Sequence, residues 1–176
     1  MMKLIVENWA QITVVLGIIG YIIKLFLDSN FKKKEISFLK IQEMKLIETK
    51  VFFQSYQSFS IALEQYINQL FHGLHSEEIF NKFRKEIRDC HIDFEYKCMT
   101  IKLFLNDVDI QTVEEISEVL KSIKIDIERC IIHINKEKRD QYWDKLEKIK
   151  KVQFRKELPS LIKKIETSLR KSYNVA

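Results

Sequence analysis

The sequence contains almost no residues that end a helix. Its 176 residues include three glycines, two of them inside one apolar stretch, and a single proline, Pro159. Because turns and strand ends depend largely on glycine and proline, this scarcity predicts a chain that is nearly all α-helix. Residues 31–176 have the length of one domain, and we expect them to form a helical bundle.

The few breaks divide the predicted bundle into helices. An uninterrupted run from about residue 31 to residue 72 ends at Gly73. Ser76, followed by two glutamates, is a good N-cap for a helix that reaches about Leu105. Further helices are expected over about 110–135 and 138–157, and Pro159 suits the first turn of a last helix that reaches about Lys171.

The stretch from Trp9 to Leu27 is the most apolar part of the sequence. Eleven of its nineteen residues are Leu, Ile, Val or Phe. As a helix it would measure about 28 Å, close to the roughly 30 Å hydrocarbon thickness of a bilayer. Lys24 lies near one end, from which its ammonium can reach the headgroups. Residues 1–30 are therefore predicted to form an N-terminal transmembrane helix.

The flanking charges set the expected orientation of this helix. Lys32, Lys33 and Lys34 follow it, whereas only Lys3 precedes it, so the positive-inside rule places the bundle in the cytoplasm and the N-terminus outside. A signal peptide fits less well, because the apolar run is long and no small-residue cleavage site follows. The three cysteines, an odd number without paired spacing, indicate reduced thiols.

Small and polar residues share one side of the predicted span. Thr13, Gly17, Gly20 and Lys24 fall within an arc of about 80° on a helix of 3.6 residues per turn. Small residues let helices approach closely, and polar residues prefer a neighbouring helix or water to lipid. The arc therefore indicates helix packing or a pore lining in a homo-oligomer, with a simple dimer seam or chance as the alternatives.

Motifs of metal, cofactor and nucleotide sites are missing from the sequence. It has no glycine-rich phosphate loop, no HExxH and no CxxC. His72 and His75 could offer two metal ligands, but no third ligand has suitable spacing, so we expect no metal and no cofactor.

An arginine and a histidine recur together on one predicted helix. Arg84 and His91, in RKEIRDCH, lie two turns apart on the same face, with Arg88 between them. Such a pair can cleave RNA without metal, the histidine as general acid or base and the arginine stabilising the charged transition state. Arg129 and His133 form a similar pair. The alternative is an ordinary surface arginine with a half-buried histidine of the bundle.

The Arg84–His91 motif inside a helical bundle resembles the HEPN superfamily, whose ribonucleases carry an Arg-x4-6-His motif at a dimer interface. Together with the N-terminal span, the architecture is similar to the small accessory membrane proteins of type VI-B CRISPR systems. That resemblance implies a bacterial inner-membrane protein that modulates an RNA-guided HEPN ribonuclease. Lys85 stands where active HEPN motifs often have a polar Asn, Asp or His. This departure favours a diverged domain without catalysis, and we commit to no catalytic residue.

The C-terminal part of the sequence is basic. From Lys136 to Lys171, thirteen Lys or Arg face six Asp or Glu, interleaved with Tyr142, Trp143 and Phe154. RNA or anionic lipid would suit this charge, and a solvated bundle face is the alternative.

Three functions are compatible with these patterns. The first is a non-enzymatic membrane effector of antiviral defence that forms a homo-oligomeric ring or pore in the lipid bilayer and enhances RNA-guided interference. The second is a membrane-tethered ribonuclease that uses Arg84 and His91. The third is a scaffold that recruits a soluble partner. An RNA-guided ribonuclease or RNA is the further partner expected, and DNA is not expected.

Overall fold

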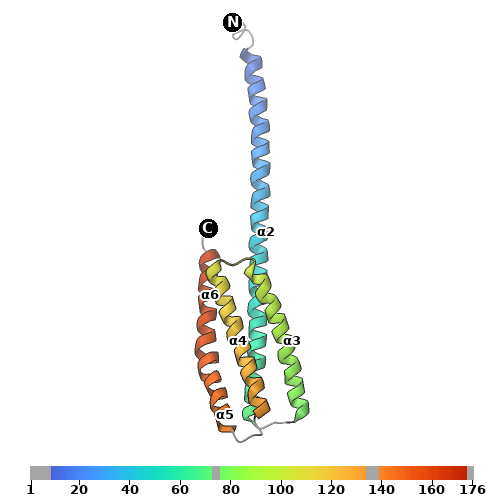
Figure 1. Cartoon of the computed structure of the whole chain (residues 1–176). Coiled ribbons are helices and arrows are strands. Elements are labelled where there is room, and N and C mark those ends of the chain that lie inside the picture. The colour runs from blue at the N-terminus through green and yellow to red at the C-terminus, as the bar shows by residue number, and fades with distance from the viewer. Residues whose placement is uncertain (1–8, 73–75, 134–138, 174–176) are drawn as a thin grey trace. The chain divides into compact units, whose positions relative to one another are not determined.

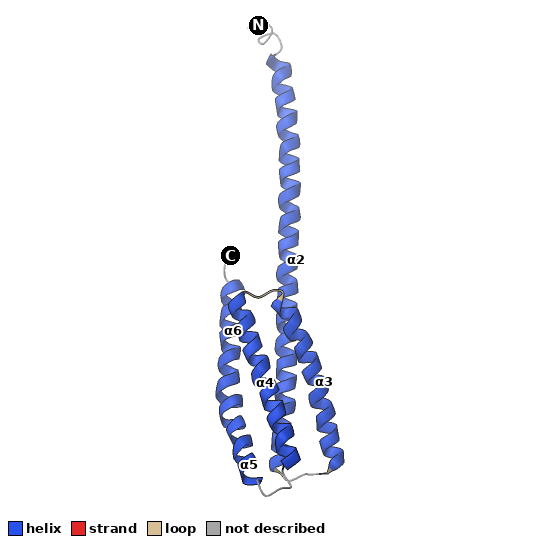
Figure 2. Cartoon of the chain, in the orientation of Figure 1, coloured by secondary structure: helices blue, strands red, loops and turns tan. Residues whose placement is uncertain are grey.

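A computed structural model describes residues 9–72, 76–133 and 139–173 of the chain. Every secondary-structure element in these ranges is helical, as the scarcity of glycine and proline predicts (Figures 1 and 2). The elements are α2 (Trp9–Phe71), α3 (Glu77–Lys102), α4 (Asp107–His133), α5 (Arg139–Lys148), η1 (Ile149–Glu157) and α6 (Leu158–Tyr173).

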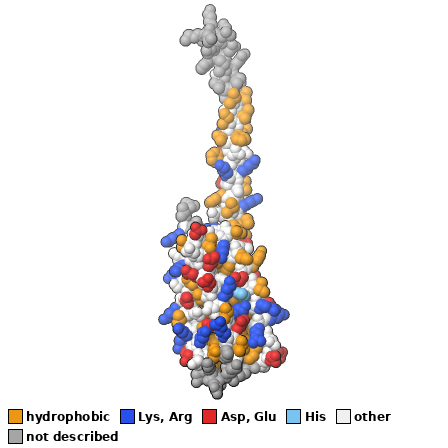
Figure 3. Space-filling model, viewed as in Figure 1, with side chains coloured by type: hydrophobic (Ala, Val, Ile, Leu, Met, Phe, Trp, Pro, Cys, Tyr) orange, Lys and Arg blue, Asp and Glu red, His pale blue; other side chains and the backbone are white. Residues whose placement is uncertain are grey.

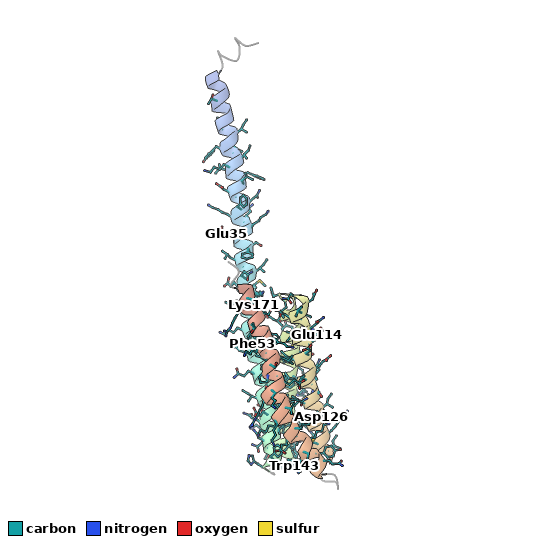
Figure 4. The ribbon with its side chains drawn as sticks, turned by 90° about the vertical axis from the view of Figure 1, so that its left-hand side faces the viewer. Glu35, Phe53, Glu114, Asp126, Trp143 and Lys171 are labelled. Carbon is teal, nitrogen blue, oxygen red and sulfur yellow. The ribbon has the colours of Figure 1, made fainter. Side chains whose placement is uncertain are left out.

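The chain forms two compact units, Met1–Leu46 and Ile47–Ala176. The described part of the first unit, from Trp9 onward, is a single stretch of helix α2. The second is an antiparallel bundle of four columns: the remainder of α2, then α3, α4 and the continuous column α5–η1–α6 (Figure 1). Trp143 lies near one end of this bundle, and Glu114 and Lys171 lie toward the other (Figure 4).

Two side chains fix where the bundle helices begin. The Ser76 hydroxyl accepts a hydrogen bond from the Ile79 backbone N–H at 3.3 Å, which confirms Ser76 as the N-cap of α3. Helix α4 begins at Asp107, three residues before the predicted start at Ile110. The reason is Asn106, whose side-chain oxygen accepts a hydrogen bond from the Asp109 N–H at 2.9 Å and so caps the helix.

The last column contains an unusual segment. The predicted helix over 138–157 is not α-helical throughout, because residues Ile149–Glu157 form a π-helix. At its end the Leu158 N–H bonds to the Gln153 carbonyl, five residues earlier. Pro159 follows directly, and in an α-helix its ring would clash with the carbonyl of Arg155. The wider π turns relieve this clash, so Pro159 lies in the first turn of α6 without breaking the column.

Aromatic rings fill the middle of the bundle. Phe94 of α3 is fully buried, and its ring centroid lies 5.9 Å from that of Phe52 and 5.8 Å from that of Phe59, both on α2. At the far end Trp143 stacks on Phe71 at 5.0 Å. From α4, Ile116, Leu120, Ile123 and Ile127 complete the core at heptad-like spacing.

The first unit has a different surface. Large apolar side chains are exposed along it, and Figure 3 shows them as orange patches along the described N-terminal helix, with white atoms and blue lysine or arginine side chains between them. Within the described residues, no helix combines the length and apolar character that crossing a membrane requires. The side chains of residues 9–12 and 14–16, part of the predicted span, lie outside the described residues.

Candidate functional site

The two motif residues lie on the same helix but in different environments. Arg84 is exposed to solvent, whereas His91 is half-buried. They are seven positions apart in the α-helix, or about 10 Å along the axis of α3. Ile87 and Phe94, both buried, hold this face of α3 against the rest of the bundle. The helix therefore carries His91 toward the interior of the bundle and leaves the Arg84 guanidinium at the bundle surface.

His91 is held between α2 and α4. Its ring centroid lies 5.2 Å from that of Phe59 on α2, with the planes inclined by 40°. Its Nδ1 atom lies 3.4 Å from the Nζ atom of Lys124 on α4. Its other nitrogen, Nε2, is buried and has no hydrogen-bond partner. Burial and the adjacent Lys124 ammonium lower the pKa of His91, and Glu95 partly opposes them.

A row of ion pairs continues from His91 along the α3–α4 contact. Glu95 bonds to Lys121 at 2.7 Å and accepts a hydrogen bond from the Ser117 hydroxyl at 2.6 Å. Burial would raise the pKa of Glu95, but these two hydrogen bonds and the Lys121 charge outweigh it and lower that pKa. Lys102 pairs with Glu114 at 2.7 Å further along. A shallow groove of about 250 Å³ lies over these side chains.

Arg84 faces a buried tyrosine. Burial raises the pKa of Tyr66 to about 12, and the positive charge of Arg84 partly opposes the shift. The Tyr66 ring stacks on Phe83 at 5.1 Å, in the turn before Arg84. Among the described residues Arg84 forms no ion pair with a carboxylate.

This geometry limits the chemistry that the motif can perform within one chain. A general acid or base must bring a nitrogen within hydrogen-bond reach of the reacting oxygen. In His91 the Nδ1 atom faces Lys124 and the Nε2 atom is buried. A phosphodiester could therefore meet Arg84 without meeting His91, and the arrangement favours a packing role for the histidine.

The residues of the small and polar arc are exposed on α2. Thr13, Gly17, Gly20 and Lys24 all lie at the surface of the first unit. A Cβ atom added at Gly17 or Gly20 would have no atom within 4 Å beyond the adjacent residues and the backbone of its own helix turns. These glycines are therefore not required by packing within the chain.

The other sequence candidates are only partly described. Among the described residues no group of three or more possible metal ligands occurs, and His75 lies outside them. Arg129 lies 3.8 Å from Asp126, and the His133 side chain is outside the described part.

The aromatic residues of the basic segment are not displayed for a ligand. Tyr142, Trp143 and Phe154 are partly buried against the core. They therefore do not form the open stacking platform that single-stranded nucleic acid uses. The exposed lysines of this segment could contact only the phosphate backbone of a nucleic acid.

The surroundings of His91 were not found from the sequence. Lys124 and Phe59 belong to other helices, and a histidine–lysine contact is not one that charge patterns favour. The sequence does indicate that His91 faces inward. Ile87, His91, Phe94 and Cys98 are four, three and four residues apart, which places the histidine on the buried face of α3. No protein-family model, no curated protein and no solved structure matches the chain.

Proposed function

We propose that this protein is a membrane-anchored, homo-oligomeric effector that acts without catalysis. The N-terminal part of α2 spans the bacterial inner membrane, and the bundle, a diverged HEPN-like domain, lies in the cytoplasm. In this proposal the protein supports an RNA-guided antiviral ribonuclease by perturbing the membrane. The observation that carries the proposal is the exposed apolar surface of the first unit. Within the predicted span this surface comprises Ile18, Ile19, Tyr21, Ile22, Ile23, Leu25, Phe26 and Leu27.

Such a surface needs a non-aqueous partner. Burying one large aliphatic or aromatic side chain contributes roughly 1.5–3 kcal/mol. Eight neighbouring side chains that remain in water represent a large unrealised free energy, and they cover every side of the helix except that of Gly17, Gly20 and Lys24. Such a broad apolar face fits lipid better than the single stripe that one partner helix would cover. Lys32, Lys33 and Lys34 then mark the cytoplasmic boundary.

The small and polar arc supports self-association of this span. Gly17 and Gly20 have no neighbour within the chain that would require glycine. Between copies, glycine permits close backbone approach, and Thr13 and Lys24 can face a shared interior. A ring of such helices would enclose a polar path, which is the pore form of the proposal.

Ribonuclease activity is the second candidate, and it is disfavoured by the surroundings of His91. A catalytic histidine titrates near neutral pH and faces the substrate. Here burial and Lys124 lower the histidine pKa, and Nε2 is buried.

Membrane extraction tests the anchor. We expect the full chain to stay in the membrane fraction after alkaline carbonate washing. Ile19→Asp together with Ile22→Asp should release it, because each aspartate at mid-span costs about 2.5–3.5 kcal/mol of insertion. Val152→Asp, on the exposed surface of η1, is the matched control and should stay in the membrane. A wild-type chain that is washed off would contradict the proposal.

Oligomer size tests the effector form. With one span per copy, a monomer or dimer cannot enclose a pore. The mass of the detergent-solubilised oligomer should therefore correspond to more than two copies. A dimeric mass would contradict the pore and would indicate an anchored protein that does not conduct.

A further inference from the structure

Helix α3 carries a second apolar surface that the anchor does not explain. Ile92, Tyr96, Met99 and Leu103 are between 59% and 80% exposed. They are four, three and four residues apart, so the three residues on α3 and Leu103, the C-cap residue that follows Lys102, form one straight stripe. We call these four residues the α3 stripe. It lies on the folded bundle, where the other large apolar side chains of α3, such as Ile87 and Phe94, are buried.

The spacing of the α3 stripe is that of a coiled-coil seam. Alternating steps of four and three residues keep apolar side chains facing a partner helix. The stripe covers about 17 Å of helix. Lys85 and Asp89, both exposed, end it on the upstream side. Contiguous exposed apolar surface of this kind marks interaction sites in folded domains.

Some of the charged residues beside the stripe are already paired within the chain, and others are not paired with another helix. On the edge facing α4, Glu95 and Lys102 already pair with Lys121 and Glu114. Arg88 makes only a loose contact with its neighbour Asp89, at 3.5 Å, and both side chains are more than half exposed. Asp93, on the other edge, is exposed and forms no ion pair in the described chain. Arg88 and Asp93 therefore flank the stripe with exposed charges that form no ion pair with another helix among the described residues.

Arg88 and Asp93 are five residues apart on opposite edges of the stripe. In a parallel helix pair, side chains at these flanking positions lie opposite each other across the seam, and opposite charges there set the pairing. Two copies of α3 side by side in the same direction would bring Arg88 of each next to Asp93 of the other. An antiparallel pair would instead depend on Glu95 and Lys102, which are engaged within the chain.

We propose that the α3 stripe binds the same stripe of a second copy of this chain, in parallel, with Arg88 facing Asp93 of the other copy across the seam. The inference rests in part on the proposed function, because anchoring in one membrane would bring two copies together. The contact is isologous and closes at two copies, so a larger ring would need the packing of the spans as well.

The short seam makes the pairing dependent on the membrane. Helix pairs of only three turns are marginal in water. Confinement of both copies by their spans raises their effective concentration and strengthens the contact without new interactions. The stripe then adds specificity and direction to an association that the spans begin.

Cysteine cross-linking in isolated membranes tests the surface and its direction. In the full chain, the single variants Ile92→Cys and Leu103→Cys should each give a disulfide-linked dimer on mild oxidation. In a parallel pair each of these residues lies opposite the same residue of the second copy. An antiparallel pair would leave both single variants monomeric and would cross-link only a mixture of the two. Ile125→Cys, exposed on α4, is the matched control and should give no dimer. Absence of a dimer from all α3 variants overturns the inference.

A charge exchange tests the Arg88–Asp93 contact separately. Arg88→Asp in the Ile92→Cys background should cause loss of the cross-linked dimer through like-charge repulsion, and Asp93→Arg should do the same. The two changes together should restore it, which a merely structural defect would not. A double variant that stays monomeric overturns the assigned contact.

The two proposals fail in different ways. If the chain stays in the membrane but no α3 variant cross-links, the surface inference is wrong and the anchor stands. If the chain is washed from the membrane yet cross-links through Ile92→Cys in solution, the anchor is wrong and the surface stands.

Discussion

The Nδ1 atom of His91 lies 3.4 Å from the Nζ atom of Lys124, so a histidine of α3 accepts a hydrogen bond from a lysine of α4. Because a lysine ammonium can only donate, this contact requires a neutral imidazole whose proton is on Nε2. That Nε2–H is buried without an acceptor. The contact between α3 and α4 is therefore built around an uncharged histidine.

This arrangement makes the stability of the bundle sensitive to acid. The pKa of His91 is lowered from its usual 6.5 in the folded chain, by burial first and then by Lys124. Lys121 acts in the same direction, and Glu95 and Glu128 oppose it. As pH falls below about 6.5, the unfolded chain binds this proton before the folded chain does, so the free energy of unfolding decreases. Denaturant unfolding at several pH values between 7.5 and 5 should show this loss.

A neutral replacement isolates the contribution of His91. His91→Gln should flatten the loss between pH 6.5 and 5, since glutamine does not titrate. Acid loss near and below pH 4.5 should persist in this variant, because Glu95, whose pKa is lowered in the folded chain, still has to be protonated. An unchanged slope above pH 5 in His91→Gln would assign the effect to another group.

The second prediction concerns RNA. We expect the purified full chain not to cleave RNA, with or without a chelator, because neither nitrogen of His91 is open to substrate. Incubation with a labelled single-stranded RNA measures this. Cleavage that Arg84→Ala and His91→Ala both abolish, at unchanged oligomer size, would replace our proposal with the ribonuclease.

The helix boundaries could be predicted where a side chain marks them. Ser76 has the polar oxygen and the following acids of an N-cap, and α3 begins there. The start of α4 is expected at about residue 110, three residues too late, because Asn106 caps the helix through its side chain. The π-helix could not be predicted, because Pro159 signals a helix start and says nothing of the turns before it. Whether the turns before Pro159 are α or π depends on how the α5–η1–α6 column packs, and not on the helix propensity of these residues.

The site was harder to predict than the fold. Periodicity places His91 and Arg84 on one face of a helix, as the structure has them. It cannot say which helix covers that face, and therefore could not identify Lys124 or Phe59. The α3 stripe could not be predicted for the same reason. Met99 and Ile101 are equally apolar in the sequence, but Ile101 is buried and Met99 is exposed.

The third prediction tests a buried polar contact between α4 and α6. Asp109 is 6% exposed, and its Oδ2 accepts hydrogen bonds from Ser168 Oγ and from Asn106 Nδ2, both at 2.8 Å. Ser168→Ala leaves a buried carboxylate with one donor fewer, which should cost about 1–3 kcal/mol of unfolding free energy. Thr167→Ala is the control, because its exposed hydroxyl bonds only to the Lys163 carbonyl of its own helix. Equal effects of the two changes would contradict the contact.

The fourth prediction concerns orientation. Native Cys98 and Cys130 are buried, and burial raises their pKa values to about 12 and about 11, so they suit thiol labelling poorly. Ser160→Cys places a thiol on the exposed surface of α6 instead. An impermeant maleimide should label it in lysed cells but not in intact ones. Labelling of intact cells would place the bundle outside the cytoplasm.

The last prediction concerns the glycines of the span. Beyond the adjacent residues and the backbone of its own helix turns, nothing lies within 4 Å of a Cβ at Gly17 or Gly20, so Gly17→Ile with Gly20→Ile should leave the folded bundle unchanged and should increase apolarity. Between copies, the added side chains would separate packed helices or fill a lumen. The double variant should therefore stay in the membrane while its oligomer and any dye uptake are lost. Ile19→Val with Ile22→Leu, on the opposite side, should change neither. If the double isoleucine variant assembles and conducts like the parent, this stretch serves only as an anchor.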